Sequence, residues 1–552
     1  MRQVDMVVVG AGFAGLRTLH TFRERGLEVA VLEAAGDIGG VWYWNRYPGA
    51  RCDVESYDYS LSFDPELEQE WRWSERYATQ PEILRYIEYV ARRYDLRRDV
   101  HLGTRMTRAA YDEDAHRWTI TTATADGTEQ WSARHLVMAT GQLSVTRTPE
   151  IEGQGDFRGR ILHTGAWPHD PVDVAGRRVG VIGTGSSGTQ LIPILAREAE
   201  HLTVFQRTPN FSIPANNAPI SDERDAEVKA EYPERRARAR RSPSGLGIAP
   251  NKQSALEVSD ADRTELYEKQ WTTAGFGFLL AYYDLMLDEA ANDTVADFAR
   301  RKIAEKVHDP ETARRLTPTG YPFGAKRPPV DSGYFETFNR DDVDLVDVRE
   351  TPIARITPDG VDLAAPDARV GSHVDLDVLV HATGFDAMTG ALLKPEILGR
   401  GGVALREHWD AGPRTYLGLG VSGFPNFFII AGPGSPSLLS NVLLSIEAHV
   451  DWLAGLLDHA AAEGADEVEP TAEAEAGWVH HVNERADATL YPRAASYYMG
   501  DNVPGKPRVF MPYVGGVRGY RRTLERVAAD DYEGFTRRGA AVGSAAVGSA
   551  AR

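Results

Sequence analysis

Two glycine-rich loops constrain the possible folds of this chain more than any other feature. The first, Gly10-Ala-Gly12-Phe-Ala-Gly15, follows an apolar run at 4–9, and the second, Gly183-Thr-Gly185-Ser186-Ser-Gly188, follows a similar run at 178–182. A strand, a glycine turn and a helix let the backbone approach a dinucleotide pyrophosphate at the helix N-terminus. The pair predicts an α/β fold with two Rossmann-like dinucleotide-binding domains.

The residue that ends the next strand of each unit indicates which dinucleotide binds. Glu33 lies 33 − 10 = 23 residues after the first glycine, where a carboxylate can accept hydrogen bonds from ribose hydroxyls. The same offset in the second unit, 183 + 23 = 206, gives Gln206, followed by Arg207 and Thr208. A missing acid and a nearby cation favour NADP over NAD; a surface arginine at a strand end is the alternative. The loops therefore predict FAD first and NADPH second.

Further small residues extend the predicted flavin site. A glycine pair in Gly39-Gly40-Val-Trp42 can allow close contact with the cofactor phosphate or the flavin ring, unless it forms an ordinary turn. The strand end Ala-Thr140-Gly141 recurs as Ala-Thr383-Gly384. Two such ends, one after each unit, match flavoproteins with two dinucleotide domains.

Composition excludes several classes of function. A net charge of −19 argues against a nucleic-acid partner and against an anionic membrane surface, so the basic run at 235–241 is interpreted as a solvated helix face. The single cysteine, Cys52, excludes a disulfide framework, a redox cysteine pair and a thiolate iron–sulfur cluster. It fits a reducing cytoplasm, and no secretory signal or long apolar run is present. No metal-binding motif occurs, so no metal site is expected.

With 552 residues the chain is expected to form two to four domains. The expected order is a first part of the FAD-binding domain (1–145), a first part of the NADP-binding domain (146–215), a helical insertion that covers the cleft (216–318), a second NADP part (319–382), a second FAD part (383–538) and a disordered tail (539–552). A monomer or homodimer is expected.

Two charged residues in turn-rich segments suggest the chemistry. FAD with NADPH implies hydride transfer to the flavin, and the lone cysteine leaves oxygen, a quinone or an organic substrate as acceptor. A C4a-peroxyflavin anion that attacks a ketone needs a fixed guanidinium to stabilise it, and Arg327 could supply one. Asp53 could orient that guanidinium. Spacing alone favours a plain ion pair, or two unrelated surface charges.

A segment between the two loops carries a more specific pattern. Phe157-x-Gly159-x-x-x-His163-x-x-x-Trp167-Pro168 resembles the fingerprint of the Baeyer–Villiger monooxygenases, the class B flavoprotein monooxygenases. The likeness runs from about residue 4 to about residue 536 and includes Arg46-Tyr-Pro-Gly-Ala-Arg-Cys-Asp53, Ala-Lys326-Arg327 and the stretch at 331–340. In appearance the chain is most similar to phenylacetone and steroid monooxygenases.

The resemblance implies an activity and a set of residue roles. It implies FAD, NADPH and O2, and conversion of a ketone to an ester or lactone through a Criegee intermediate. Arg327 would be the active-site arginine with Asp53 as its partner, and Lys326 and Arg207 would hold the 2′-phosphate. His163 would couple domain movement to catalysis. The substrate pocket would include Ser437, Leu438 and Leu439.

One departure and two alternatives follow. The family loop carries a tryptophan where this chain has Tyr497, and an alanine where it has Asp501, which leaves substrate scope and NADP retention open. The nearer alternative is a flavin-dependent N- or S-oxygenase of related fold, whose fingerprint normally lacks the terminal Trp167-Pro168. The other is a dinucleotide-dependent sensor without turnover. The sequence does not indicate which ketone is used, or the regio- and enantioselectivity.

Overall fold

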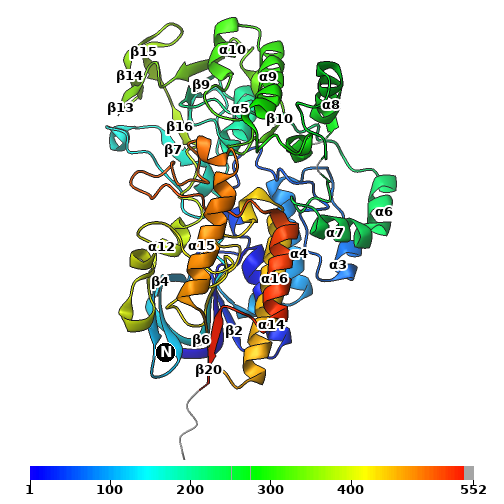
Figure 1. Ribbon diagram of the computed structural model, residues 1–552. Helices are drawn as coiled ribbons and strands as arrows, with labels where there is room; N and C mark the ends of the chain where they lie inside the picture. Colours follow the sequence, from blue (N-terminus) through cyan, green and yellow to red (C-terminus); the bar gives the residue numbers. More distant parts are fainter. Residues whose placement is uncertain (250, 274, 540–552) are drawn as a thin grey trace, which may run out of the picture.

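The computed structural model describes residues 1–249, 251–273 and 275–539. Figure 1 shows two sheets, one toward each end of the molecule, with the chain passing between them more than once. Of the tail expected to be disordered, only Gly539 is described; the remainder lies outside the described residues.

The first sheet has eight strands and contains the first glycine loop. Its order is β17-β4-β5-β6-β1-β2-β3, and β18 also pairs with β6. β1 is parallel to β2 and β6, whereas β4, β5 and β6 form the expected antiparallel meander. The strands are β1 (Arg2–Val9), β2 (Val29–Leu32), β3 (Val100–His101), β4 (Arg105–Asp112), β5 (Arg117–Thr124), β6 (Gly127–Met138), β17 (Glu396–Leu398) and β18 (Phe427–Ile429).

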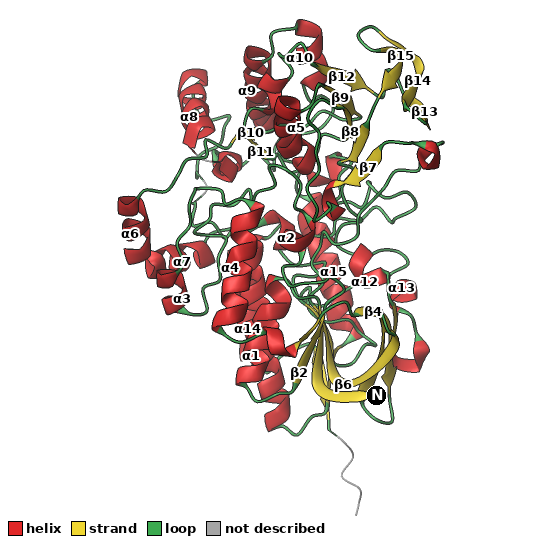
Figure 2. Cartoon of the chain, turned by 180° about the vertical axis from the view of Figure 1, so that it is seen from behind, coloured by secondary structure: helices red, strands yellow, loops and turns green. Residues whose placement is uncertain are grey.

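Helices from both ends of the chain cover one face of this sheet (Figure 2). They are α1 (Phe13–Glu24), α4 (Gln80–Arg93), α14 (Val442–Ala462) and α16 (Gly516–Ala529). Apolar residues at helical spacing give α4 one buried face, through Ile83, Ile87 and Val90. α14 packs on α1 and is apolar nearly all round, as a helix buried on most sides must be.

The second sheet has five parallel strands in the order β12-β9-β8-β16-β7. They are β7 (Arg160–His163), β8 (Arg178–Ile182), β9 (His201–Gln206), β12 (Val343–Asp347) and β16 (Val378–His381). α5 (Ser186–Glu198) starts directly after the second glycine loop. A small antiparallel sheet, β13 (Ile353–Thr357), β14 (Gly360–Asp367) and β15 (Gly371–Asp375), packs beside it.

The region at 216–318 is mostly helical, with the expected break found at 242–249 and continued at 251–259 among the described residues. Its helical segments are α6 (Asp222–Ala230), α7 (Tyr232–Arg241), α8 (Asp260–Thr273), η4 (Gly275–Leu280), α9 (Glu289–Lys306) and α10 (Pro310–Leu316). α8 and α9 contribute Tyr267, Trp271 and Phe298 to the core of the second sheet. α7 instead contacts α16 beside the first sheet. The region therefore packs on both units.

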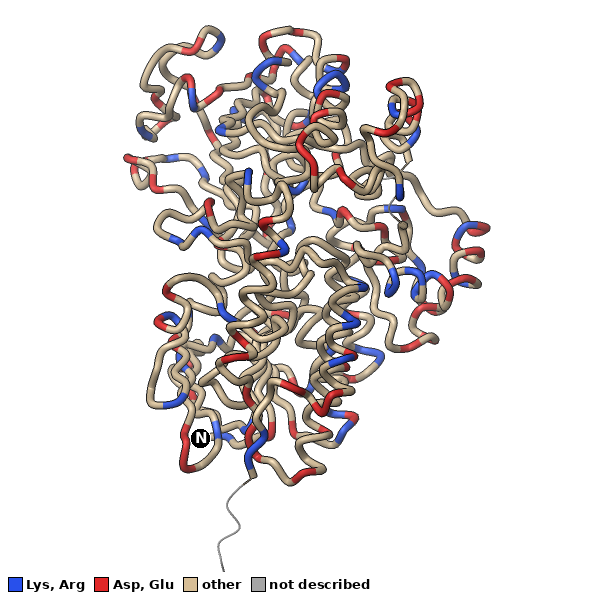
Figure 3. The backbone as a smooth tube through the Cα atoms, in the orientation of Figure 1, with Lys and Arg blue, Asp and Glu red and all other residues tan. Residues whose placement is uncertain are grey.

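The basic run at 235–241 is not the solvated face that its composition suggested. Arg236 is buried and its Nε lies 2.7 Å from a carboxylate oxygen of Glu68. Arg235 forms an ion pair with Asp58 at 2.6 Å. Charge pairing with distant segments offsets the cost of burying these arginines, and Arg238 and Arg241 are the exposed arginines of α7. Figure 3 shows both signs of charge interleaved there.

The remaining elements connect these units. They are α2 (Val41–Trp44), α3 (Pro65–Glu70), η1 (Arg97–Asp99), η2 (Gln154–Asp156), η3 (Thr164–Ala166), β10 (Ile213–Pro214), β11 (Val330–Asp331), α11 (Tyr334–Thr337), α12 (Gly390–Leu393), η5 (Arg400–Gly402), α13 (Leu405–His408), η6 (Ser437–Leu439), β19 (Glu467–Pro470), α15 (Ala472–Asp487), η7 (Tyr491–Arg493) and β20 (Phe535–Arg538). Within the part of the chain that the structure describes, every helix is too short or too polar to cross a membrane.

Candidate active site between the two sheets

One cavity of about 1400 Å³ extends from the first glycine loop to the second. Most of the predicted site residues line it. They are Gly10, Gly12, Glu33, Gly40, Trp42, Asp53, Gly183, Gly185, Ser186, Arg207, Thr208, Lys326, Arg327, Ser437, Leu438 and Tyr497. Gly15, Gly188, Leu439 and the five fingerprint residues lie outside its wall. The volume exceeds that of an ordinary single-ligand pocket.

Glycines at equivalent positions of the two loops serve the same structural purpose. A Cβ on Gly15 would lie 1.8 Å from the Gly10 carbonyl oxygen, and a Cβ on Gly188 would lie 2.3 Å from that of Gly183. These third glycines allow the helix to pack on its strand, which explains their place behind the cavity wall. A Cβ on Gly185 would meet nothing within 4 Å, so the second position leaves the approach to the backbone open.

Glu33 ties the first loop to the turn beyond β2. Its carboxylate accepts the Ala11 N–H at 2.7 Å and the Ala35 N–H at 2.8 Å. Both oxygens keep lone pairs on the cavity side, and a ribose presents hydroxyl donors. This geometry agrees with the predicted FAD site.

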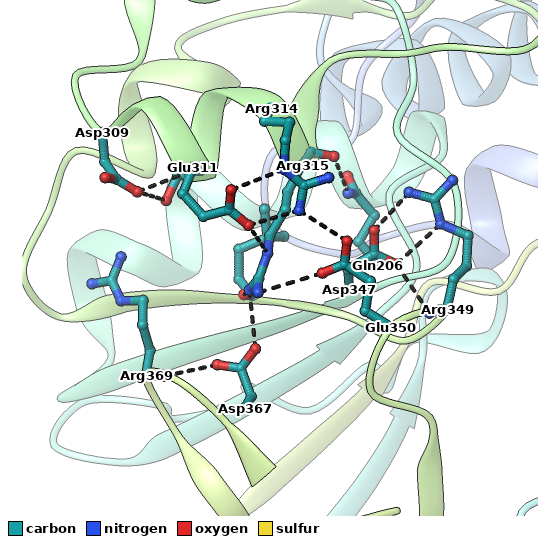
Figure 4. A network of polar contacts seen from close by, with 12 residues as sticks. Gln206, Asp309, Glu311, Arg314, Arg315, Asp347, Arg349, Glu350, Asp367 and Arg369 are labelled. Carbon is teal, nitrogen blue, oxygen red and sulfur yellow. Dashed lines mark hydrogen bonds and ion pairs between the residues drawn. The ribbon is translucent and has the colours of Figure 1, made fainter. Parts of the chain in front are cut away.

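Gln206 does not face the cavity, contrary to the expectation that it would take the place of the acid. Its side chain is buried, and its Nε2 donates to the Arg315 carbonyl at 2.8 Å, within the polar network of Figure 4. Arg315 is held by Asp367 at 3.0 Å. The two cations predicted for this end of the cavity, Arg207, which is exposed, and Lys326, do line it.

Arg207 and Lys326 form no ion pair within the described ranges of the chain. Burial lowers the pKa of Lys326, and the charge of Arg207 lowers it further, while Asp501 opposes them. The Lys326 ammonium lies 4.7 Å from the centre of the Tyr321 ring. Two cations without an ion-paired carboxylate leave positive charge at this end of the cavity, where an anion could bind.

Arg327 and Asp53 meet in the cavity wall, as the chemical argument requires. Nε of Arg327 lies 2.7 Å from one Asp53 oxygen and Nη2 lies 2.8 Å from the other. Nη1 donates to the Leu438 carbonyl at 2.7 Å. Burial by itself would lower the pKa of Arg327, but the charge and hydrogen bonds of Asp53 raise it well above its usual value. The guanidinium is therefore a permanent, fixed cation.

The fingerprint forms the edge of the second sheet rather than a free linker. β7 pairs with β16, so that His163 lies beside His381. Nδ1 of His163 accepts the Gly165 N–H at 2.9 Å, and Nε2 donates to the Arg147 carbonyl at 3.2 Å. Trp167 is buried in the core of the second sheet. The fingerprint side chains therefore fix the backbone next to the cavity, consistent with a role outside the chemistry.

Sequence reasoning missed two residues that contribute to the site. Arg147 lines the cavity, and burial and the charge of Arg207 lower its pKa. The ring of Phe276 lies over the Arg327 guanidinium, with 4.3 Å between Cζ and the ring centre. Arg147 follows the Thr140-Gly141 strand end, which was a usable signal. Phe276 lies in a helical region without a motif and had none.

Tyr497 lines the cavity from a loop that is bound to the segment after β16. Its ring packs on Tyr498 with 4.5 Å between ring centres. Further along the loop, Asn502 donates to the Phe385 carbonyl at 2.6 Å, and Lys506 lies 2.6 Å from an Asp386 oxygen. Because Phe385 also contacts His163, the loop and the fingerprint share a neighbour.

Comparison with known proteins gives full-length relatives. Residues 4–232 match the pyridine nucleotide-disulphide oxidoreductase family. A Baeyer–Villiger monooxygenase of Pseudooceanicola batsensis is 43% identical, with 97% of this chain and 96% of the relative covered. A phenazine N-monooxygenase of Lysobacter antibioticus is also 43% identical, with 96% of each covered. A steroid monooxygenase structure bound to NADP superimposes with a TM-score of 0.92 at 54% identity, over 98% of this chain and 100% of that one.

These relatives, with a further matching structure that contains both FAD and NADP, confirm the resemblance inferred from the fingerprint, the α/β fold with two dinucleotide-binding units and the pairing of FAD with NADPH. The disulphide in the name of the matched family has no counterpart here, because the single cysteine, Cys52, is free and buried. The chain belongs to the Baeyer–Villiger monooxygenases, flavoproteins that use FAD, NADPH and O2 to insert one oxygen atom beside a ketone carbonyl.

Proposed function

We propose that this chain oxygenates a ketone to an ester or lactone, with Arg327 as the catalytic cation and Asp53 as its positioning partner. The bidentate contact between these two side chains, in the wall of the cavity that joins the two glycine loops, carries the proposal. FAD would occupy the first loop and Glu33, and NADPH the second loop. When bound, NADPH supplies a hydride and the reduced flavin reacts with O2.

The hydrogen bonds of Arg327 leave donors free for the substrate. A guanidinium has five N–H groups. Asp53 takes one from Nε and one from Nη2, and the Leu438 carbonyl takes one from Nη1. Beyond these three bonds, one N–H on each terminal nitrogen remains, and the Tyr498 side chain lies within hydrogen-bonding reach of the guanidinium. These two donors can hold the oxygen of a ketone and stabilise the negative charge that develops on it during addition.

The pocket for the ketone would lie beside these donors. Ser437 and Leu438 line the cavity, and Leu438 packs with Tyr497. Leu439 lies outside the cavity wall but shares an apolar cluster with Leu438 and Tyr497, and would act through packing. An apolar wall around a pair of donors suits a ketone, which is apolar except for its carbonyl.

The 2′-phosphate of NADPH would bind between Arg207 and Lys326, with Thr208 beside them. The support is the pair of unneutralised cations in the cavity wall. We also assign 1–145 and 383–538 to FAD binding and 146–215 and 319–382 to NADPH binding, with 216–318 covering the cleft. A cytoplasmic location fits the lone buried cysteine, Cys52, and we expect a monomer or homodimer.

A second candidate is N-oxygenation, because one relative at 43% identity is a phenazine N-monooxygenase. Oxygen transfer to a nitrogen lone pair creates no carbonyl oxyanion, so it does not need the two free Arg327 donors. The site geometry therefore favours the ketone.

Incubation with aryl, cyclic and steroidal ketones, and with phenazine, tests the choice. The molecular mass of each product is measured to detect a gain of one oxygen atom. The product is then treated with alkali, which hydrolyses an ester but not an N-oxide. Oxygenation of phenazine alone would replace the proposed reaction.

A further inference from the structure

A second, smaller cavity lies against the Arg327–Asp53 pair. Its volume is about 230 Å³. Asp53 and Val54 line both cavities, whereas Arg327 lines only the large one and Phe276 only the small one. Since the Phe276 ring lies 4.3 Å from the guanidinium carbon, the stacked pair is part of the partition between the cavities.

The small cavity is suited to water. Charged residues form much of its wall, among them Glu55, Asp58, Arg235 and Arg238. Arg235 pairs with Asp58 at 2.6 Å and with Glu55 at 3.3 Å. Such a wall offers hydrogen-bond partners on several sides, and the volume exceeds the roughly 30 Å³ that one water occupies. Phe276 is among the side chains that lie between this polar space and the reaction cavity.

Phe276 also completes the fixation of Arg327. Asp53 and the Leu438 carbonyl hold the edges of the guanidinium, and hydrogen bonds in the plane do not cover its faces. An aromatic ring over one face attracts the cation and excludes water from that face. Gly275 makes this placement possible: its φ is +49°, and a Cβ there would lie 2.3 Å from the Tyr77 hydroxyl.

We propose that Phe276 is a positioning residue that holds the Arg327 guanidinium and seals the reaction cavity against water from the small cavity. The inference rests on the proposed role of Arg327. In the coupled reaction, NADPH, H⁺, O2 and ketone give NADP⁺, water and ester. If water reaches the site, the same NADPH, H⁺ and O2 give NADP⁺ and H2O2, and the ketone is unchanged.

The first test compares Phe276→Ala with the wild type and with Leu280→Ala. Leu280 lies in the same short helix, is half-buried and lines neither cavity, so it is a matched control. NADPH consumption, H2O2 and ester are measured with ketone, and NADPH consumption and H2O2 without it. In Phe276→Ala we expect H2O2 per NADPH to rise about three- to tenfold, with anaerobic flavin reduction unchanged within about twofold. Phe276→Trp, which keeps an aromatic ring at this position, should keep H2O2 per NADPH near the wild-type value.

A suppressor variant identifies the source of the water. Ile248 lines the small cavity and is half-buried. Ile248→Trp should fill that cavity and lower the H2O2 yield of Phe276→Ala. Unchanged yield in the double variant would overturn the small cavity as the source.

A readout independent of turnover tests the positioning. Hydrogen–deuterium exchange of the backbone around Arg327 should accelerate in Phe276→Ala and stay unchanged in Leu280→Ala. Equal uncoupling in both variants, or wild-type coupling in Phe276→Ala, would overturn the proposal. The H2O2 measurement without ketone is informative even if the wild type oxygenates no ketone, the outcome that would defeat the proposed function instead.

Discussion

Glu33 and Gln206 occupy equivalent positions in the two sheets, but only Glu33 turns toward its glycine loop. The Gly10 N–H binds the carbonyl of the residue before Glu33 at 2.8 Å, and the Gly183 N–H binds that of the residue before Gln206 at 3.0 Å. Glu33 then accepts the Ala11 N–H, whereas Gln206 donates to Arg315 in the protein interior. The positive charge near the second loop therefore comes from other residues, among them Arg207, Lys326 and Arg147.

Cofactor preference should follow from these cations. Arg207→Ala is expected to weaken NADPH binding by about 1.5–3 kcal/mol, the typical value of a hydrogen bond to a charged group. NADH, which lacks the phosphate, should be affected little. Michaelis constants for both cofactors check this. A wild type that uses NADH and NADPH equally well would contradict it.

Because Gln206 is buried, its substitution should change the stability of the protein and not its cofactor preference. Gln206→Glu should not convert the enzyme to NADH, because the new carboxylate would lie in the interior beside the Arg315 carbonyl. It should instead lower the midpoint of thermal unfolding. An unchanged midpoint together with efficient use of NADH would show that the side chain reaches the cofactor.

Two glycines of the first loop should respond differently to the same substitution. In Gly12→Val the new Cβ would meet only the Gly40 backbone, at 3.4 Å, so the protein should fold but exclude FAD and purify colourless. In Gly15→Val the Cβ would lie 1.8 Å from the Gly10 carbonyl oxygen, so folding itself should fail. Flavin absorbance and circular dichroism separate the two outcomes. Full flavin absorbance in Gly12→Val would remove the first loop from the flavin site.

Asp501 should oppose binding of the phosphate. It lines the cavity that contains Lys326 and Arg207, and it forms an ion pair with Arg508 at 3.1 Å. Asp501→Asn removes one negative charge, and NADP⁺ should bind about two- to fivefold more tightly, as expected for a partly exposed charge. Arg508→Ala should weaken binding by freeing the carboxylate, and should have no effect in the Asp501→Asn background. Tighter binding of NAD⁺ as well would point to a general change in the loop.

Elements with a regular apolar pattern could be predicted from the sequence. The strands and helix around Gly10 and Gly183, the meander before Met138 and the apolar face of α4 all follow from local spacing. The site residues on these elements were found for the same reason. Their motifs are local, and the glycines leave little freedom in the backbone that they specify.

Contacts between distant segments could not be predicted in this way. Arg236 was expected in solvent because its neighbours are basic, but its partner, Glu68, lies 168 residues away. Gln206 was expected at the cofactor because β9 places it at the right position, but α10 supplies a backbone carbonyl that turns it away. Phe276 meets Arg327 only through the packing of a helical region that has no motif.

Buried histidines should make the fold sensitive to acid. Burial lowers the pKa of His449 to about 3, and it also lowers the pKa of His135 to about 3 and that of His381 to about 4. Each folded value is below the usual 6.5, so the unfolded chain binds protons more readily as pH falls. The stabilisation that depends on these neutral histidines is fully present above about pH 6.5. Below that pH, each histidine should lower the free energy of unfolding by about 1.4 kcal/mol per pH unit.

Urea unfolding of the wild type and of His449→Gln between about pH 8 and pH 5 checks this sensitivity. Nδ1 of His449 accepts the Ala431 N–H at 3.0 Å, and Nε2 donates to the Tyr520 hydroxyl at 2.7 Å. The variant loses part of this network and should be less stable at pH 8, but its free energy of unfolding should fall less steeply with acid. Equal slopes would assign the acid sensitivity to other groups.

The last prediction separates flavin reduction from oxygenation. Hydride transfer needs only NADPH and flavin held in register, whereas addition to a ketone needs the free N–H groups of Arg327. Arg327→Ala should therefore bind FAD and be reduced by NADPH under anaerobic conditions, yet form ester about 10²–10³-fold more slowly, as when one preorganised oxyanion donor is lost. Arg327→Lys should restore little, because an ammonium cannot bind both Asp53 oxygens, reach the Leu438 carbonyl and still present two donors. Asp53→Ala should be milder, since the Leu438 carbonyl and the Phe276 ring still hold the guanidinium. Ester formation by Arg327→Ala at nearly the wild-type rate, measured after reduced enzyme is mixed with oxygen and ketone, would return Arg327 and Asp53 to the status of a structural ion pair.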